Sequence, residues 1–386
     1  MDKSLWRWKK WHADCKHNRI SLESIGTVKV TFISHAQPSL FAFHHRMKKL
    51  AEGLCRLNVK TNFLYLKEYP FKGPSLLQPL NLPFIREKLR DSDFIHAGNV
   101  LSTLCLGFLL PMKHQTIICD LHGDVVSEAK LKIKFHYSLI NLFNLFQAKI
   151  ADHFAIRFSD YFLAVCEPLK QSYVTKGVPR DKLWVIRNGV DTTLFDFQKP
   201  KKFNELVITY AGGFQVWQGI GNLLRAVELI SKRSKIKLKI IGLNSTQTEL
   251  RKRLMKRLQD KVILVDRMPQ EELIPHLKNS SFFIIPRDKH PAVYHAFPTK
   301  FAEYLSIGRP IIVTDVDETA DFVRTYKCGI VTRSNPESIA EGIERASELS
   351  SNEICAMGRN ARSLAVQQFD WKIISKQYLN YLKQVS

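Results

Sequence analysis

The fold class of this chain is decided by one stretch, Pro298-Thr299-Lys300-Phe301-Ala302-Glu303-Tyr304-Leu305-Ser306-Ile307-Gly308-Arg309-Pro310-Ile311-Ile312-Val313-Thr314-Asp315. It predicts a short helix followed by a buried strand. Pro298 fits the first turn of a helix, where its missing N–H costs little. Gly308 suits the left-handed residue that ends a helix, and Pro310 prevents continuation. Residues 311–313 form an unalternated apolar run, which is typical of a parallel strand buried on both faces.

The start of this helix has a chemical use. Free N–H groups at a helix start bind phosphate, and Lys300 adds a full positive charge there. Glu303, about one turn later, is placed to accept hydrogen bonds from vicinal hydroxyls such as those of a ribose. The combination predicts a nucleotide site. An ordinary helix–turn–strand unit with a solvated Lys and Glu is the alternative that the stretch alone leaves open.

Length and composition indicate a globular protein of two domains. The chain has 386 residues, of which 45% are hydrophobic and 24% charged, as in soluble proteins of this size. The longest apolar candidate, residues 101–112, is shorter than the roughly 20 residues of a membrane span. The N-terminus lacks the pattern of a secretory signal. We therefore expect a cytoplasmic protein without a membrane-spanning helix.

The cysteines and carboxylates give no sign of a metal site. Seven cysteines are scattered through the sequence without CxxC spacing, which favours reduced thiols over a disulfide framework or a zinc site. No clustered carboxylates resemble a metal cage. We expect no metal and no bound cofactor.

A formal charge of +22 is the most unusual bulk property. Residues 1–200 contain 29 Lys and Arg against 17 Asp and Glu, and the rest of the chain contains 29 against 19. The excess is therefore spread along the whole chain. It favours anionic partners, namely phosphorylated small molecules, an anionic membrane surface or nucleic acid. Charge alone does not choose among them.

Two segments mix basic and apolar residues. Residues 1–26 are expected to be an irregular extension, and its Trp6-Arg7-Trp8-Lys9-Lys10-Trp11 run suits a membrane interface, a nucleic-acid backbone or simply a loosely packed leader. Residues 130–157 are rich in Lys, Phe, Leu and Ile. Amphipathic periodicity favours a helix that covers a sheet, and a face that touches a membrane is the alternative.

Strands and helices alternate along both halves of the chain. The expected strands are at residues 28–34, 59–66, 94–97, 116–120, 161–165, 183–186, 207–210, 238–242, 262–265, 282–286, 311–313 and 329–332. This alternation predicts the α/β class, with two Rossmann-like, doubly wound parallel-sheet domains facing a cleft. Residues 27–197 form the first domain, the polar segment 198–204 the linker, and residues 205–370 the second domain. Residues 371–386 form a last helix.

Several segments in the same order resemble one family, the retaining glycosyltransferases of family 4, which have the GT-B fold. The segments that match this family are Cys119-Asp120-Leu121-His122-Gly123-Asp124, Val165-Cys166-Glu167-Pro168-Leu169, Lys176-Gly177-Val178, Val185-Ile186-Arg187-Asn188-Gly189-Val190-Asp191, Tyr210-Ala211-Gly212-Gly213-Phe214, Trp217-Gln218-Gly219 and the opening stretch. Each match is weak alone, but together they are specific. The resemblance covers residues 27–384.

The resemblance implies a nucleotide-sugar donor bound by the second domain, an acceptor bound by the first, retention at the anomeric carbon and no required metal ion. Glu303 matches the glutamate that holds the ribose. The backbone of Thr299 and Lys300, after Pro298, would hold the diphosphate. The last helix would cross back to the first domain. The leading hypothesis is transfer of a sugar to a lipid-linked or oligosaccharide acceptor, in surface polysaccharide or glycolipid synthesis, by an enzyme peripheral on the inner membrane face.

His122 is the first domain's candidate catalytic residue, beside Glu303 in the second. It directly follows an expected strand and precedes Gly123, so its imidazole would project from the carboxyl end of the sheet. There it could hydrogen-bond the sugar or the attacking hydroxyl. A structural histidine is the alternative. Asp124 is a weaker candidate.

The chain departs from the family pattern at the donor site. Gly213 and Gln218 stand after Gly212 where many relatives carry an Arg and a Lys, so two cations for the diphosphate are missing. Arg287 could supply the lost charge, and a surface arginine is the alternative. His295 stands where the family has its other glutamate.

A further departure lies in the first domain, where Ala42-Phe43-His44-His45 replace the usual glycine pair. These changes keep a second hypothesis open, a non-catalytic GT-B protein that binds nucleotide or glycan. Nucleic-acid binding is a third hypothesis from the charge alone, and the absence of any nucleic-acid motif disfavours it.

Overall fold

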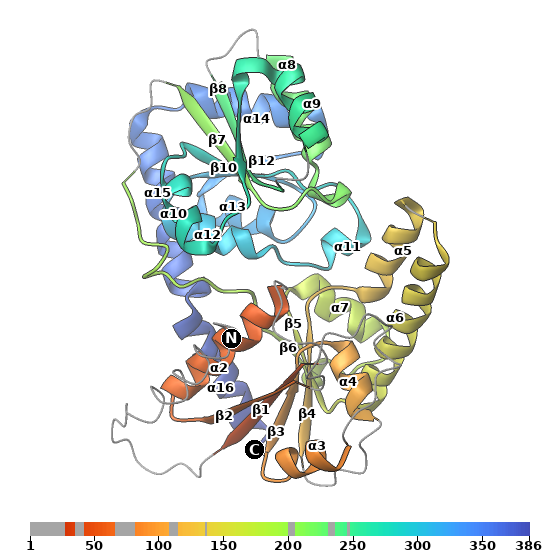
Figure 1. Cartoon of the computed structure of the whole chain (residues 1–386). Helices are drawn as coiled ribbons and strands as arrows, with labels where there is room; N and C mark the ends of the chain where they lie inside the picture. Colours follow the sequence, from red (N-terminus) through yellow and green to blue (C-terminus); the bar gives the residue numbers. More distant parts are fainter. Residues whose placement is uncertain are drawn as a thin grey trace, which may run out of the picture. The chain divides into compact units, whose positions relative to one another are not determined.

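The computed structural model describes residues 28–34, 42–65, 82–107, 115–135, 137–199, 205–230, 236–244 and 248–386. These residues form two compact units (Figure 1). Unit 1 takes the described parts of Met1–Val165 together with Lys170–Ile186 and Trp371–Ser386, and unit 2 takes Cys166–Leu169 and Arg187–Asp370. Each unit is an α/β structure built on one parallel sheet.

The sheet of unit 1 has six strands in the order β2-β1-β3-β4-β5-β6, and every neighbouring pair is parallel. The strands are β1 (Lys29–Ser34), β2 (Lys60–Tyr65), β3 (Phe94–Ala97), β4 (Thr116–Leu121), β5 (Tyr161–Ala164) and β6 (Leu183–Val185). The central strand β3 is buried at every position, as expected for a strand covered on both faces.

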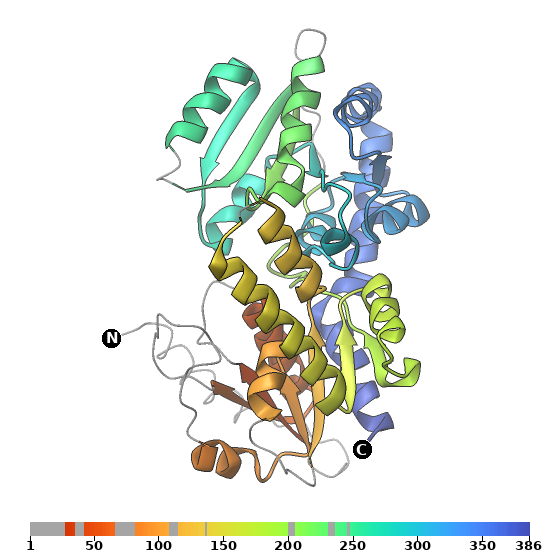
Figure 2. The ribbon, with the colours of Figure 1, turned by 90° about the vertical axis from the view of Figure 1, so that its right-hand side faces the viewer.

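Helices connect the strands of unit 1. They are α2 (Ala42–Arg56), α3 (Leu82–Leu89), α4 (Val100–Gly107), α5 (Val125–Phe135), α6 (Leu139–Phe158), α7 (Glu167–Thr175) and α16 (Trp371–Gln384). α16 packs beside α2, and its Trp371, Ile374, Tyr378 and Leu382 join the core over β1 and β3. α5 and α6 lie side by side and extend away from the sheet (Figure 2).

The sheet of unit 2 also has six parallel strands, in the order β12-β11-β10-β7-β8-β9. The strands are β7 (Leu206–Ala211), β8 (Ile236–Leu243), β9 (Val262–Asp266), β10 (Phe282–Ile285), β11 (Ile311–Thr314) and β12 (Gly329–Thr332). In both sheets the strand order reverses beside the first strand of the unit. Ligands of such sheets bind outside the carboxyl ends of the strands at this position.

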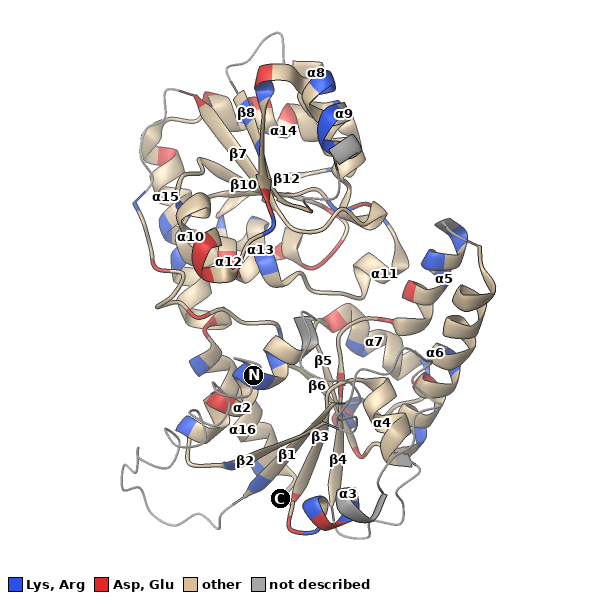
Figure 3. Cartoon of the chain, in the orientation of Figure 1, with Lys and Arg blue, Asp and Glu red and all other residues tan. Residues whose placement is uncertain are grey.

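Helices cover both faces of the second sheet. They are α8 (Ile220–Ile230), α9 (Thr248–Leu258), α10 (Gln270–Lys278), α11 (Pro291–Tyr294), α12 (Thr299–Ile307), α13 (Thr319–Tyr326), α14 (Pro336–Glu348) and α15 (Ser351–Leu364). Figure 3 colours Lys, Arg, Asp and Glu on the ribbon, and most of them lie on the helices and loops of both units. The strands mainly carry the core, although Asp120 in β4 and Lys239 in β8 are buried charged residues.

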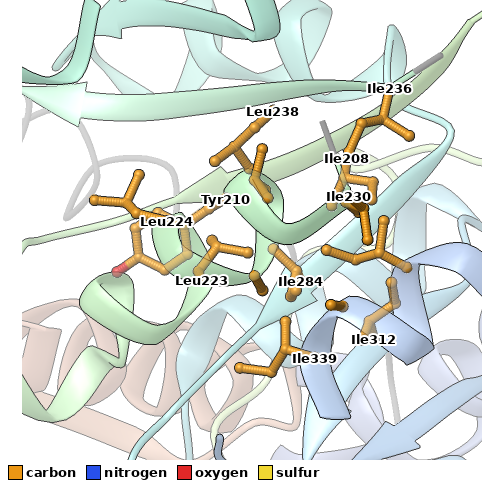
Figure 4. Close-up of a cluster of buried hydrophobic side chains, with 14 of the residues drawn as sticks. Ile208, Tyr210, Leu223, Leu224, Ile230, Ile236, Leu238, Ile284, Ile312 and Ile339 are labelled. Carbon is orange, nitrogen blue, oxygen red and sulfur yellow. The ribbon is translucent and has the colours of Figure 1, made fainter. Parts of the chain in front are cut away.

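The core of unit 2 shows why the apolar runs become strands. Ile208, Leu238, Ile284 and Ile312 come from four neighbouring strands and meet helix residues such as Leu223 (Figure 4). Each is almost completely buried. Burial of such a side chain stabilises the fold by about 1.5–3 kcal/mol relative to leaving it in water.

The fold class predicted from the sequence is confirmed. Each of the twelve expected strands is present, with ends shifted by two residues at most. One prediction is wrong: residues 130–157 are not a single helix but parts of α5 and α6, and Ser138 caps the start of α6 by accepting a hydrogen bond from the N–H of Asn141.

Some expectations fall outside the described residues. These are the extension at residues 1–26 and residues 200–204 of the linker. Among the helices that the structure describes, none is long and apolar enough to span a bilayer.

Candidate functional site

The start of α12 carries the first group of donor-site candidates. Pro298 is the residue before the first helical turn, not within it as the sequence predicts, and no side chain caps this end of α12 in the described structure. Gly308 ends the helix in the left-handed conformation, with φ of 76°. The N–H groups of the first turn are the donors that an anion would accept. α12 therefore presents them beside the side chains of Thr299 and Lys300.

Lys300 contacts the loop that follows β7. Its Nζ donates to Gln218 Oε1 at 3.2 Å and lies 4.2 Å from the centre of the Tyr210 ring. Burial lowers the pKa of Lys300 to about 7, and the nearby charge of Arg287 adds to this effect while Glu303 opposes it. Among the described contacts, no carboxylate accepts a hydrogen bond from this ammonium group. An anionic ligand would therefore favour its charged form.

The conformation of Gly212 makes room for Lys300. Its φ is 151°, and a Cβ at this position would lie 2.5 Å from Lys300 Nζ. The next residue, Gly213, accepts a hydrogen bond of 2.5 Å from the Tyr210 hydroxyl. Tyr304, fully buried on α12, accepts from the N–H of Ala211 at 2.8 Å. Tyr304 therefore ties the end of β7 to the helix that carries Lys300, and Tyr210 holds the glycine loop against β7.

Arg287 is a buried cation and not the surface arginine of the alternative interpretation. It is 5% exposed, and its Nη1 donates to Asp317 Oδ2 at 2.5 Å and to Ala296 O at 3.2 Å. Its Nε is buried and has no hydrogen-bond partner among the described residues. Because a buried donor without a partner costs free energy, this guanidinium is suited to donate a hydrogen bond to an additional anionic partner.

Glu303 lies one turn after Lys300. Its Oε1 accepts from Gln270 Nε2, the first residue of α10, at 3.1 Å. Burial raises the pKa of Glu303 to about 7, while Gln270 and Lys300 lower it. The carboxyl group is oriented by this amide and retains a second oxygen as a hydrogen-bond acceptor.

His295 ends α11, where its ring lies 5.4 Å from that of Tyr294. It directly precedes Ala296, whose carbonyl oxygen accepts a hydrogen bond from Arg287. The structure brings together Gly212, Gln218, Lys300 and Glu303, with Arg287 nearby.

In unit 1, His122 follows β4 and belongs to a buried polar network. Its Nε2 lies 2.9 Å from Gly98 O and 3.5 Å from Asp120 Oδ2. Burial lowers the pKa of His122, although Asp120 raises it. A neutral imidazole that donates from Nε2 to Gly98 O presents Nδ1 as its acceptor atom.

Asp120 is the centre of this network. Arg46 holds both of its oxygens, with Nε to Oδ2 at 2.8 Å and Nη2 to Oδ1 at 3.1 Å. His96 lies between Asp120, at 3.4 Å, and the hydroxyl of Tyr378 on α16, at 2.9 Å. Burial alone would raise the pKa of Asp120, but Arg46, His122 and His96 together outweigh it and keep that pKa far below its usual range.

The remaining unit 1 candidates have local roles. Asp124 accepts hydrogen bonds from the N–H groups of Val126 and Ser127, both at 3.1 Å, so it caps the start of α5. His44 is buried on α2, and burial together with nearby His122 lowers its pKa to about 4. The glycine pair of the family is thus replaced by a neutral imidazole close to His122.

Sequence reasoning did not find several partners of the candidate residues. These are Tyr210 and Gln270, which contact Lys300 and Glu303, Asp317, which holds Arg287, and Arg46 with His96 around Asp120. Each lies on or beside a different element from its partner, and the pair Arg46–Asp120 is 74 residues apart. The available signal was the position of Gln270 and Asp317 shortly after strands.

Metal ligands do not gather in the described part of the chain: no group of three or more His, Cys, Asp or Glu side chains there could hold an ion.

Comparison with known proteins places this geometry in a family. The model for "Glycosyltransferase Family 4" matches residues 27–194, and the model for "Glycosyl transferases group 1" matches residues 191–364. An uncharacterized glycosyltransferase of Methanocaldococcus jannaschii, MJ1607, is 27% identical over 54% of this chain, and the match spans about half (55%) of that relative. WcaL of Escherichia coli K12, provisionally named a colanic acid biosynthesis glycosyltransferase, is 21% identical over 74% of each chain.

Solved structures show the same fold at low identity. Sucrose-phosphate synthase of Thermosynechococcus elongatus superposes with a TM-score of 0.73 at 16% identity, covering 93% of this chain and 99% of that one. HepE of Anabaena, in complex with UDP and glucose, gives 0.69 at 16% identity, covering 92% and 100%. The two family models adjoin within one chain whose two parallel-sheet units match these neighbours, and the chain therefore belongs to the family 4 glycosyltransferases of the GT-B fold.

Proposed function

We propose that this protein is a retaining glycosyltransferase that moves a sugar from a nucleotide-sugar donor to a lipid-linked or oligosaccharide acceptor without a required metal ion. The observation that carries the proposal is the cluster at the start of α12, where Lys300 faces Gly212 and Gln218 beside the buried Arg287. This cluster offers N–H donors and two cations to one anion.

The donor diphosphate is proposed to bind at Pro298, Thr299 and Lys300. Departure of a nucleoside diphosphate creates negative charge, which helix N–H groups and cations stabilise. Arg287 is proposed to replace the cations missing at Gly213 and Gln218, because its unpartnered Nε has a hydrogen bond to offer. Asp317 holds the guanidinium in place through Nη1.

The donor ribose is proposed to bind Glu303. Gln270 orients the carboxyl group and leaves one oxygen for the two vicinal hydroxyls. His295, at the position of the family's other glutamate, is proposed to contact the sugar as a neutral donor or acceptor in place of a carboxylate. HepE was solved with UDP and with UDP-glucose, so UDP-linked sugars are the first donors to test.

His122 is proposed to hydrogen-bond the transferred sugar or the attacking hydroxyl. Its lowered pKa keeps the imidazole neutral at pH 7, so it can accept a proton or a hydrogen bond. Asp120 and Gly98 O hold the ring in one orientation. Asp120 is thus a positioning residue for this histidine.

The setting that we propose is surface polysaccharide or glycolipid synthesis on the inner face of the cell membrane. The charge of +22 supports an anionic surface as partner. The name of WcaL points to polysaccharide synthesis. The acceptor that we propose is an oligosaccharide or a lipid-linked glycan.

Radiolabelled sugar nucleotides tested one by one with a membrane lipid extract, in the presence of EDTA, examine this function. We expect labelled product with one donor, EDTA to leave the rate unchanged, and the donor's anomeric configuration to be kept in the product. Absence of both transfer and slow donor hydrolysis with every donor would contradict it.

A second candidate function is non-catalytic binding of nucleotide or glycan, which the uncharged Gly213 and Gln218 and the replaced glutamate at His295 favour. It predicts that a nucleoside diphosphate binds while neither transfer nor hydrolysis occurs. Donor consumption by the parent protein, by Glu303→Ala and by His122→Ala separates the two functions. A glycosyltransferase loses activity in the variants, whereas a non-catalytic protein shows the same background consumption in all three.

A further inference from the structure

The first half of α6 exposes an apolar surface. Its large apolar side chains, with Tyr137 just before the helix, are among the most exposed in the described chain. Their exposed fractions are Tyr137 73%, Leu139 81%, Ile140 72%, Leu142 36%, Phe143 39% and Phe146 59%. We name these six residues the α6 patch. Apolar side chains gathered in this way mark an interaction site more often than a plain surface.

Most of the patch faces away from the buried side of α6. The buried residues of α6 are Gln147, Ala151, Asp152 and Ala155. At 100° per residue, Leu139, Phe143 and Phe146 lie roughly 100–165° around the helix from the centre of that buried stripe, while Ile140 lies within roughly 45° of it. The helix is therefore amphipathic toward α4 and α5 and carries a second apolar row that does not cover the sheet. A helix that simply covers a sheet does not account for this second apolar row.

The charge around the patch has one sign. From residue 129 to residue 151 the sequence contains no Asp or Glu. Lys130, Lys132 and Lys134 on the adjacent α5 are exposed, as is Lys149 on α6 itself. Figure 3 shows basic residues on α5 beside the mostly uncharged surface of α6. A purely apolar protein interface would not require such a basic rim, whereas an anionic surface is complementary to it.

We propose that the α6 patch and these four lysines dock unit 1 on an anionic lipid surface. The aromatic and leucine side chains enter the boundary between headgroups and acyl chains, and the lysines meet the lipid phosphates. A helix of this kind does not cross the bilayer but lies in the plane of the membrane–water interface. The proposal names the surface by which the enzyme meets its membrane, and it does not depend on transfer activity, because vesicle binding is measured without donor or acceptor.

The test is flotation of the full-length protein with vesicles of phosphatidylcholine alone or of phosphatidylcholine with phosphatidylglycerol. We expect binding to the anionic vesicles that weakens with salt. Combining Leu139→Ser, Phe143→Ser and Phe146→Ser, or combining Lys130→Gln, Lys132→Gln and Lys134→Gln, should each reduce the partition coefficient by about tenfold or more. Thermal unfolding verifies that the variants fold. If the apolar triple variant does not fold, the single variant Phe146→Ser replaces it in the flotation test.

Matched controls remove the same chemistry elsewhere. Leu229→Ser with Met255→Ser removes exposed apolar side chains of unit 2, which are 54% and 48% exposed. Lys252→Gln, Lys256→Gln and Lys383→Gln together remove three exposed lysines outside the patch.

Parent-like binding by the controls and loss in the patch variants supports the proposal. Equal binding by patch variants and parent, or no preference for anionic vesicles, overturns it. It is also overturned if light scattering shows a parent dimer that the apolar patch variant abolishes while the parent leaves vesicles unbound, because the patch then serves a second copy of the chain.

Discussion

Lys300 combines features that a residue with a purely structural role would not need. Its ammonium group is partly buried and lies over the Tyr210 ring. The positive charge of Arg287 is near enough to lower its pKa. Without an anion this arrangement costs free energy, because burial and like charge both disfavour the charged form. The diphosphate that we propose to bind here would supply the missing negative charge.

The lowered pKa of Lys300 predicts a pH dependence of nucleotide binding. With a pKa of about 7 in the free protein, Lys300 loses its proton as the pH rises above 7. An anion binds the protonated form, so the affinity for a nucleoside diphosphate should fall between pH 7 and pH 9 by up to about tenfold per unit. Calorimetric titration at several pH values measures this fall.

The matched variant for this prediction is Lys300→Gln, which cannot titrate. Its weaker affinity should lack the fall caused by Lys300. Above pH 7, where the nucleotide phosphates are mostly ionised, only the titration of Glu303, whose pKa burial raises to about 7, should still change it. A parent affinity that is constant from pH 7 to pH 9 would show that Lys300 does not meet the phosphates.

In unit 1, the buried carboxylate of Asp120 is paired with the guanidinium of Arg46. Asp120→Asn leaves the Arg46 guanidinium buried without its anion, so we expect a loss of about 3–5 kcal/mol in the free energy of unfolding at pH 7. Because the pKa of Asp120 is lowered in the folded state, its stabilisation is present above the unfolded pKa of about 4 and is lost as the pH falls below it. Urea unfolding of parent and variant should therefore converge at acid pH; a gap that stays constant would contradict the ion pair's role.

At the scale of the elements, the loop after β7 and the start of α12 act as one piece. Tyr304 ties α12 to Ala211, Tyr210 ties the strand to Gly213, and Lys300 reaches over Gly212. The shape of this glycine loop therefore determines where the ammonium group lies. The loop has no cation of its own, and its contribution is to leave room for the Lys300 side chain.

Gly212→Ala tests that contribution. The added Cβ would lie 2.5 Å from Lys300 Nζ at a residue whose φ is 151°, so Lys300 must move away and the backbone is strained by about 1–3 kcal/mol. We expect nucleoside diphosphate affinity to fall by about tenfold or more in calorimetry. Gly221→Ala is the control, since a Cβ there meets nothing within 4 Å, and it should bind as the parent does. Parent-like binding by Gly212→Ala would mean that Lys300 is not held by this loop.

Elements were more predictable than contacts. The unalternated apolar run at residues 311–313 became a buried parallel strand, because such a run suits an interior position. The break between α5 and α6 was missed because helical periodicity continues on both sides of Ser138. The pairing of Arg287 with Asp317 and of Arg46 with Asp120 was missed because it depends on which strands become neighbours in a sheet, and strand order is not written in any local pattern.

At the scale of the whole molecule, the chain ends by returning to its first unit. α16 follows the last residues of unit 2 in sequence, yet Ile374, Tyr378 and Leu382 are buried in the core of unit 1 and Tyr378 bonds His96. Unit 1 therefore cannot complete its core until the last helix has been made. Unit 2 has its own core and does not need it.

Ending the chain after Asp370 should therefore unfold unit 1 selectively. Loss of three fully buried side chains costs several kcal/mol, which is a large part of the stability of one domain. Hydrogen exchange should become fast in β1 and β3 and remain slow in β7 and β10, so unit 2 is the internal control. Equal loss of protection in both units would contradict this division of the cores.

The central claim is that the start of α12, with Lys300, stabilises the charge of the departing nucleoside diphosphate. The most direct measurement is the turnover number and the donor dissociation constant of Lys300→Ala beside the parent protein. We predict that the substitution lowers turnover by a larger factor than it lowers donor affinity, because the leaving-group charge develops in the transition state. Unchanged turnover with weakened donor binding would contradict it.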